Sequence, residues 1–595
     1  MADRPVFELG LVMAGAISAG AYTAGVMDFI IEALDAYEAA KLTPGWDGPT
    51  HDVRVPVMAG ASAGGMTSAI SALQAFHEIE HVRAVVPPPP PEKNRLYSSW
   101  VRDIDLKPML ATSDLDTDAA TGVKSVLDCS VLETIVENAF RLSGPPKARN
   151  WLGRGDDPSL RVLLTLTNLR GVPYSLQIFG ANIDDYAMLN HGDYLDFTVG
   201  IKPTAVAGSY ALDICDTTTP NWEVFKKAAL ATGAFPVGLA PRLISRPTAD
   251  YWRILQVGFQ DSAKCQFVPI PPNPKINAAD PYEFVAVDGG TIDNEPLEIG
   301  RRILEETGRG ARDGLEARKA IILIAPFPSF AELPQLNSGT SILEVLPQLM
   351  TGLIQQARFK PEELAMAVSD KVFSRFLISP IRPAPPANEY AVHYPIASGT
   401  LGGFGGFIDE SFRRHDYLLG RRNAQAFLRW NFALPEHNSL FDGPPINRDK
   451  WCVRNASSQT GDLTRADESK LEYQKFLEYA QSDNRSRGLP IIPLCDSLCV
   501  PIQIGHEDLP KPDEINFPAL QALIETRAGK VIANFVDVGL EEVTKSISFG
   551  GLLRWPAVHY LTQIATKKAG GKVSGAIQDV EEAFRTMPPF KPFGE

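Results

Sequence analysis

One segment of the sequence has the residue types and spacing needed to activate a nucleophile. GASAG at residues 60–64 follows a short apolar stretch at 53–58 and precedes small and apolar residues at helical spacing. A strand, a tight turn of small residues and a helix form the context that a G-x-S-x-G nucleophile elbow requires. The segment therefore predicts Ser62 as a nucleophile for acyl transfer.

The residues around Ser62 suit this chemistry for physical reasons. Gly60 and Gly64 lack the Cβ atoms that would crowd the strained turn. The helix expected after Ser62 directs its N–H groups and the positive end of its dipole at the serine, where negative charge develops during acyl transfer. We predict that the N–H group of Ala63 is one donor to the oxyanion.

A second candidate group is Asp288, which ends an apolar strand expected at 284–287. Open parallel sheets place their working groups at the carboxyl ends of strands. An Asp-Gly pair also occurs simply as turn chemistry, so Asp288 gains significance from the elbow serine upstream. Asp288 is therefore the second member of the candidate site.

A third segment, the small residues at 14–25, follows a strand expected at 7–13. Gly15 and Gly20 have the spacing of half a phosphate-binding loop, but the next two positions lack its Lys and Ser/Thr, and the order G-x-G-x-x-G is absent as well. A backbone oxyanion hole and close packing of a helix on the sheet remain, and they are compatible. The predicted donors in this loop are the N–H groups of Gly15, Ala16 and Ile17.

Four segments, in this order, resemble the patatin-like phospholipase family. They are MAGAISAGAYTAGV at 13–26, GASAGG at 60–65, KKAALATGAFPVGLAP at 226–241 and VDGGTIDNEP at 287–296. The resemblance covers roughly residues 6–330 and implies hydrolysis of lipid acyl esters by a Ser–Asp dyad without histidine, with Ser62 as nucleophile and Asp288 as base. It implies no metal or organic cofactor. The structural positions of the last motif are Gly289, Gly290, Asn294 and Pro296.

The chain departs from the family pattern in the first loop. The family usually has a basic residue where this chain has Ala19, so the backbone donors are kept and a positive charge is not. Loss of one oxyanion donor lowers rates about a hundredfold or more in other enzymes. Three alternatives follow: another cation substitutes, the activity is modest, or the substrate differs from that of the family.

A Ser–Asp–His triad is the alternative to the dyad, because the chain order allows five of the histidines. None of the five lies in a recognisable catalytic context, and His415 is expected to be a satisfied surface or interface residue. The five histidines are His393, His415, His437, His506 and His559.

The segment at 412–430 carries five arginines on one helical face. One interpretation is a basic stripe for phosphate head groups. The favoured interpretation is that the arginines form an exposed, solvated face or pair with the carboxylates of this acidic protein. The arginines are Arg413, Arg414, Arg421, Arg422 and Arg429.

Composition limits the partners and the location. The net charge of −14 argues against general binding to nucleic acid. No uninterrupted apolar run of about 18 residues predicts a transmembrane helix, and the first residues lack the apolar region of a secretory signal. The six scattered cysteines indicate reduced thiols rather than a disulfide framework or a zinc site. We expect a cytoplasmic protein whose contact with a membrane, if it has one, is local and peripheral.

The sequence predicts an α/β scaffold for these groups, because two successive segments each have the order strand, turn of small residues and helix. We predict an open, mainly parallel sheet with helices on both faces over 1–330, with a proline-rich surface insertion at 87–91. A helical extension at 331–434 and a helical and loop region at 435–595 follow. Other expected helices lie at 26–40, 131–140, 222–231, 296–306, 342–354 and 407–430, and other expected strands at 161–169, 174–179 and 320–325.

The predicted function is a serine acyl hydrolase that cleaves fatty-acyl ester bonds of phospholipids or related lipids. Two alternatives remain at this point. A patatin-fold lipid-binding or scaffold protein that has lost catalysis is favoured by Ala19. An acyltransferase would use the same dyad and pass the acyl group to an acceptor other than water.

Overall fold

A computed structural model describes residues 4–327 with short gaps, and parts of the chain beyond them. The gaps are 85–86, 117–121, 142–143, 156, 158, 177–185, 205 and 262–263. Beyond 327 the described residues are 352, 373–381, 396–399, 403–451, 488–504, 510 and 514–537. The helix expected at 342–354 and most of the region 435–595 therefore lie outside the described residues.

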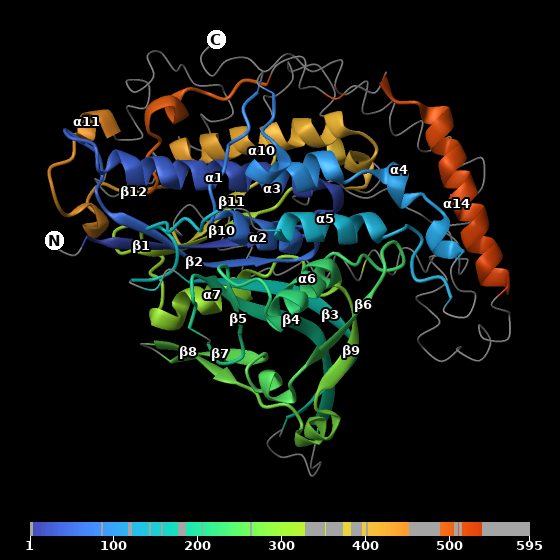
Figure 1. Cartoon of the computed structure of the whole chain (residues 1–595). Helices are drawn as coiled ribbons and strands as arrows, with labels where there is room; N and C mark the ends of the chain where they lie inside the picture. The colour runs from blue at the N-terminus through green and yellow to red at the C-terminus, as the bar shows by residue number, and fades with distance from the viewer. Residues whose placement is uncertain are drawn as a thin grey trace.

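An open, mainly parallel sheet forms the centre of the molecule (Figure 1). Its strand order is β11-β10-β1-β2-β3-β4-β5, and the four pairs from β11 to β3 are parallel. Buried apolar runs, such as that of β2, are typical of parallel strands covered on both faces. The predicted fold class is confirmed. The strands are β1 (Val6–Met13), β2 (Asp52–Gly60), β3 (Leu160–Leu176), β4 (Tyr186–Gly200), β5 (Tyr210–Asp213), β10 (Lys319–Ile324) and β11 (Arg375–Ile378).

The strand that carries Asp288 runs in the opposite direction to that expected. β9 (Tyr282–Asp288) is antiparallel to β3, with Asp288 opposite Leu166, and β6 (Arg242–Arg246) pairs with its other side. Asp288 thus ends an apolar strand, as predicted, but this strand is not one of the parallel strands whose carboxyl ends suggested its role. A short apolar strand does not encode its direction, and β9, a member of the same sheet, approaches the carboxyl ends of the parallel strands from the opposite direction.

β3 is one long strand where the sequence predicted two. Its register against β4 shifts between Thr167 and Val172, and Gly171 in this irregularity has a φ of +75°. A glycine with positive φ lets a strand bulge and continue.

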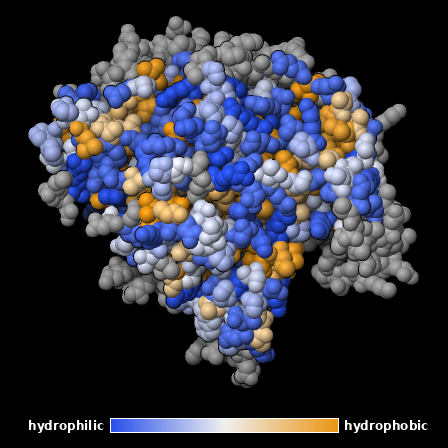
Figure 2. Space-filling view, in the orientation of Figure 1, coloured by the Kyte–Doolittle hydropathy of each residue, from blue (hydrophilic) through white to orange (hydrophobic). Residues whose placement is uncertain are grey.

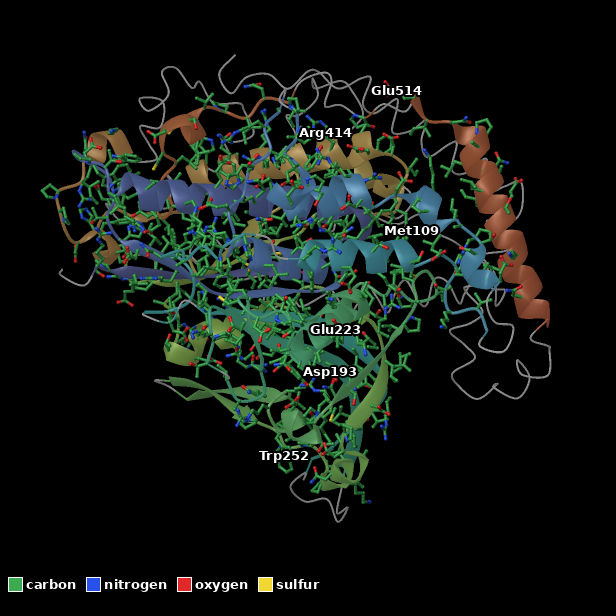
Figure 3. All side chains as sticks on the ribbon, in the orientation of Figure 1. Met109, Asp193, Glu223, Trp252, Arg414 and Glu514 are labelled. Carbon is green, nitrogen blue, oxygen red and sulfur yellow. The ribbon has the colours of Figure 1, made fainter. Side chains whose placement is uncertain are left out.

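The lower lobe in Figure 1 is built from the far half of β3, β4, β6, β9 and the hairpin of β7 (Gln256–Asp261) and β8 (Lys264–Pro269). Asp193 pairs there with Arg246 at 2.9 Å, and both side chains are buried (Figure 3).

Helices cover both faces of the sheet. Figure 1 shows α1 (Gly20–Ala40) and α10 (Glu410–Trp430) side by side above it and α7 (Leu297–Leu304) below it. α1 begins six residues before the predicted start, because the small residues after the 3₁₀ turn Ile17–Ala19 are already helical. Further helices are α2 (Ser62–Gln74), α3 (Arg95–Tyr97), α4 (Leu106–Met109), α5 (Ser130–Phe140) and α6 (Pro220–Thr232).

α1 and α10 touch backbone to backbone. A Cβ atom on Gly25 would overlap the carbonyl oxygen of Tyr417, and one on Gly420 would overlap that of Tyr22. Beside this contact the buried guanidinium of Arg421 pairs with the carboxylates of α1, at Asp28 and Glu32.

The favoured interpretation of the arginines, pairing with carboxylates, is therefore confirmed for Arg421. Arg413 and Arg422 are also buried, and both donate to backbone carbonyl oxygens. With three of the five arginines inside the protein, this helix presents no exposed basic stripe.

Segments beyond 330 share the core of the residues before them. β11 extends the central sheet, and α10 packs on α1. β12 (Ala433–Pro435) and β13 (Gly488–Pro490) form a separate pair near α11 (Arg448–Trp451). α14 (Phe517–Asp537) lies at one edge, where Arg527 pairs with Asp114.

Among the described residues, one helix is long and apolar enough to cross a membrane. It spans Ile17–Ala40, and 94% of its most apolar window is buried inside the protein. Burial of this kind is what the core helix of a globular fold shows, so the hydropathy of α1 is explained by its packing between α2 and α10.

Candidate active site

Ser62 lies at the junction of β2 and α2 in a strained backbone conformation. Its φ is +53°, in the left-handed region that residues other than glycine rarely occupy. A Cβ atom on Gly60 would overlap the carbonyl oxygen of Gly64, and one on Gly64 would overlap that of Met13. The turn can thus form only with glycine at both positions, and it places Ser62 as the first residue of α2.

Ser62 and Asp288 come together in the structure. The Ser62 Oγ donates a hydrogen bond of 2.6 Å to Oδ2 of Asp288, and both residues are buried. The second carboxylate oxygen of Asp288 accepts the N–H of Gly290 at 2.7 Å. The carboxylate is therefore held on both oxygens and faces the hydroxyl that it is predicted to deprotonate.

Burial raises the pKa of Asp288 to about 7, and the hydrogen bonds from Ser62 and Gly290 oppose this rise. Removal from water disfavours the charged form of a carboxyl group. A group with a pKa near neutrality is a far better proton acceptor than an ordinary aspartate and is still largely ionised at slightly alkaline pH. Asp288 can therefore act as a general base in its present environment.

The small-residue loop passes directly over Ser62. A Cβ atom on Gly15 would lie 3.0 Å from the Cβ of Ser62. The N–H of Gly15 donates to the carbonyl oxygen of Asn294 at 3.0 Å, so this group is engaged and is not a ready oxyanion donor. The roles predicted for Ala16, Ile17 and Ala63 stay predictions.

Asn294 connects the loop to the turn that follows Asp288. Its side-chain amide lies 3.5 Å from the carbonyl oxygen of Gly15, and its Oδ1 occupies the space that a Cβ atom on Gly290 would need. A Cβ atom on Gly289 would overlap Thr165. These contacts explain why the DGG turn needs its glycines and why an asparagine follows.

A glycine-rich segment at 403–407 covers the outer side of the loop. The Ser18 hydroxyl donates to the carbonyl oxygen of Gly403 and accepts the N–H of Gly406 at 3.0 Å. Arg413 donates in turn to the carbonyl oxygen of Gly406 at 2.8 Å. Ala19 is fully buried beneath this layer, so the position that is basic in the family has no exposed space here.

The histidines in the described residues do not complete a triad. His415 is fully buried on α10 and is bonded to Asp416, whose carboxylate also accepts the N–H groups of Ala397 and Ser398. His437 is exposed. The other three candidates lie outside the described residues, at His393, His506 and His559.

Sequence reasoning missed two threonines that bind the dyad. Thr232 Oγ1 accepts the N–H of Ser62 at 3.0 Å, and the Thr167 hydroxyl donates to the carbonyl oxygen of Asp288 at 2.8 Å. Thr232 belongs to the segment KKAALATGAFPVGLAP, whose resemblance to the family was the available signal, although its role was not evident. Thr167 lies within a run of alternating polar residues on β3 and carries no such signal.

Three comparisons place this chain among known proteins. Residues 11–300 match the family described as patatin-like phospholipase. The uncharacterized protein y4iI of Sinorhizobium fredii is 37% identical over 481 residues, which are 74% of this chain and 67% of that protein. VipD from Legionella pneumophila aligns with 12% identity over 94% of this chain and 91% of its own, but its TM-score of 0.20 carries no argument about the fold.

The family match covers the residues that form the candidate site. The matched range contains the loop at 15–19, the elbow serine and the DGG turn. The chain therefore carries a patatin-like phospholipase domain over residues 11–300.

Proposed function

We propose that this protein is a serine acyl hydrolase that cleaves fatty-acyl ester bonds of phospholipids or related lipids. The observation that carries the proposal is the hydrogen bond of 2.6 Å from Ser62 Oγ to Asp288, made at the N-terminus of α2. The raised pKa of Asp288 supports its role as base.

The proposed reaction uses the chain's own groups. Asp288 takes the proton of Ser62 while Oγ bonds to the carbonyl carbon of the ester, and the N–H groups of Ala16, Ile17 and Ala63 are the candidate donors to the resulting oxyanion. Asp288 then returns the proton to the leaving alcohol. Asp288 next takes a proton from water as the water oxygen bonds to the carbonyl carbon of the acyl-enzyme. It then returns this proton to Ser62 Oγ as the bond between Oγ and the acyl carbon breaks and the fatty acid leaves.

A fluorophosphonate probe tests the proposal directly, because it labels only an activated serine. We expect labelling of Ser62 and hydrolysis of a short-chain ester, with loss of both in Ser62→Ala and in Asp288→Asn. Thermal melts of the two variants distinguish lost chemistry from lost folding. A folded wild-type protein that neither binds the probe nor turns over ester would overturn the proposal.

A binding or scaffold protein on the same fold is the second candidate. Two observations favour it: the N–H of Gly15 is engaged by Asn294, and the buried Ala19 supplies no cation. The probe result separates the two candidates. An acyltransferase would give the same labelling, so the products formed in the presence of an added alcohol decide between water and another acceptor.

Peripheral contact with a membrane is part of this proposal. Leu243 on β6 and Val285 on β9 are cross-strand neighbours, 61% and 41% exposed, and Leu169 on β3 is also exposed. Figure 2 shows apolar surface over β6 and β9. Since β9 ends in Asp288, this surface leads toward the site and supports docking onto lipid.

We also propose a cytoplasmic location. Four cysteines in the described part of the chain are free thiols, namely Cys129, Cys215, Cys495 and Cys499. Reduced thiols are typical of the cytosol, where disulfides are rare.

A further inference from the structure

One turn at the end of α6 holds both members of the dyad by their backbone. Thr232 is the last residue of α6, and its Oγ1 accepts the N–H of Ser62 at 3.0 Å. Two residues later, the carbonyl oxygen of Ala234 accepts the N–H of Asp288 at 2.9 Å. Ser62 comes from the β2–α2 junction and Asp288 from β9, so these two bonds connect elements that are otherwise separate in the chain.

The Ser62 amide needs such a partner. The first N–H groups of a helix have no acceptor within the helix, and Ser62 is buried, so water does not readily replace one. Its φ of +53° is also a conformation that the surrounding structure must hold in place. Thr232, itself fully buried, supplies the acceptor from outside α2.

Two glycines allow α6 to approach α2 this closely. A Cβ atom on Gly65 would lie 2.7 Å from both Cγ2 and Oγ1 of Thr232, and one on Gly233 would lie 2.7 Å from the Sδ of Met66. Gly65, the last glycine of GASAGG, is not required by the nucleophile elbow itself and is thus explained by the threonine that it accommodates.

We propose that the turn Thr232–Ala234 positions the dyad and that Thr232 is the positioning residue for the nucleophile. By fixing the amides of Ser62 and Asp288 to one rigid turn, it sets the 2.6 Å contact between their side chains. Thr232 does not touch the reacting atoms. The inference rests on the proposed hydrolase function, because it assigns a role within that chemistry.

The test compares Thr232→Val, which keeps the side-chain shape and removes the acceptor, with Thr232→Ser, which keeps the acceptor. We expect the rate of fluorophosphonate labelling at Ser62 to fall at least tenfold in the valine variant and to be largely recovered in the serine variant. For a short-chain ester, kcat should fall while KM stays near that of the wild type. Thr23→Val is the matched control, since the Thr23 hydroxyl is buried and has no hydrogen-bond partner among the described residues.

A pH profile separates positioning from a general loss of stability. The hydrogen bond from Ser62 lowers the pKa of Asp288, so a misplaced serine should move the acid limb of the labelling profile to higher pH in Thr232→Val. Partial unfolding would lower the amplitude and leave the limb in place.

Gly65→Ala provides a second variant if Thr232→Val does not fold. It keeps the hydroxyl of Thr232 but forces it away from Ser62, and we expect slow labelling again. Wild-type labelling with undiminished rates in the folded variants would overturn the positioning role and leave the hydrolase standing. Failure of the wild type itself to label would instead refute the proposed function.

Discussion

At the scale of single residues, the site depends on a carboxyl group that is buried away from water, where its charged form is disfavoured. Asp288 is buried, and the two groups that hydrogen bond to it only partly offset the loss of water. Its folded-state pKa of about 7 lies above the ordinary value of 3.8. Between pH 3.8 and about 7, the folded protein therefore keeps a proton on Asp288 that the unfolded chain has released. This difference makes both activity and stability depend on pH.

Activity should rise with pH through about 7, because only the ionised Asp288 can take the proton of Ser62. The measurement is the rate of fluorophosphonate labelling of the wild-type protein between pH 5 and pH 9, with far-UV circular dichroism confirming a folded protein throughout. A rate that stays constant across this range would show that Asp288 does not control the nucleophile.

Asp288→Asn should melt at a higher temperature than the wild type at pH 8. A carboxyl group whose pKa is raised in the folded state stabilises the fold most at low pH. Stability is then lost as the pH rises from the pKa of the group in the unfolded chain to its pKa in the folded protein. The amide carries no charge and avoids this loss. The difference in Tm should shrink toward pH 4, and the matched measurement on Ser62→Ala shows whether losing the hydroxyl alone has the same effect.

At the scale of elements, neighbouring segments enclose the loop before α1, and its backbone has unusual dihedral angles. Ala16 has a φ of −147° and Ile17 a φ of +47°. Proline, whose φ is near −65°, fits neither position. A proline there would distort the backbone as well as remove an N–H group, so it is a poor test of the oxyanion hole.

Ala19→Arg should destabilise the fold rather than restore the family's charge. Ala19 is fully buried, and at the next position a Cβ atom on Gly20 would already overlap the ring of Trp100. A guanidinium placed here has neither room nor a prepared partner. We expect a large drop in Tm or insoluble protein. Ala39→Arg, on the exposed side of the same helix, is the control and should fold normally. A folded and faster Ala19→Arg enzyme would contradict this view of the loop.

The sequence was enough to select Ser62 and Asp288 as candidate site residues and to predict parallel strands, since each has a local pattern with a physical cause. The direction of β9 could not be predicted, because pairing partners far apart in the chain decide it. The bonds of Thr232 to Ser62 and of Asn294 to Gly15 also depend on segments that meet only in the folded protein. Sequence position alone does not reveal which backbone donors are engaged.

At the scale of the whole molecule, the exposed apolar face of β6 and β9 gives a further expectation. Leu243→Glu should reduce turnover of phospholipid vesicles severalfold and leave turnover of a soluble short-chain ester unchanged, because a charge weakens docking onto lipid but not the chemistry. Leu42→Glu, an exposed leucine just beyond the far end of α1, is the control. Equal loss on both substrates would mean that Leu243 supports the fold instead.

The contact of α1 with α10 also has a consequence during synthesis. Arg421 follows its partner Asp28 by 393 residues, so at roughly 5–20 residues per second about 20–80 s pass on the ribosome between the two. Throughout that interval the apolar helix α1 lacks the cover of α10, and Asp28 and Glu32 on it lack one of their partners, Arg421. We therefore expect a nascent chain that stops before residue 410 to expose the face of α1 that α10 covers, and to bind a chaperone that recognises apolar surface.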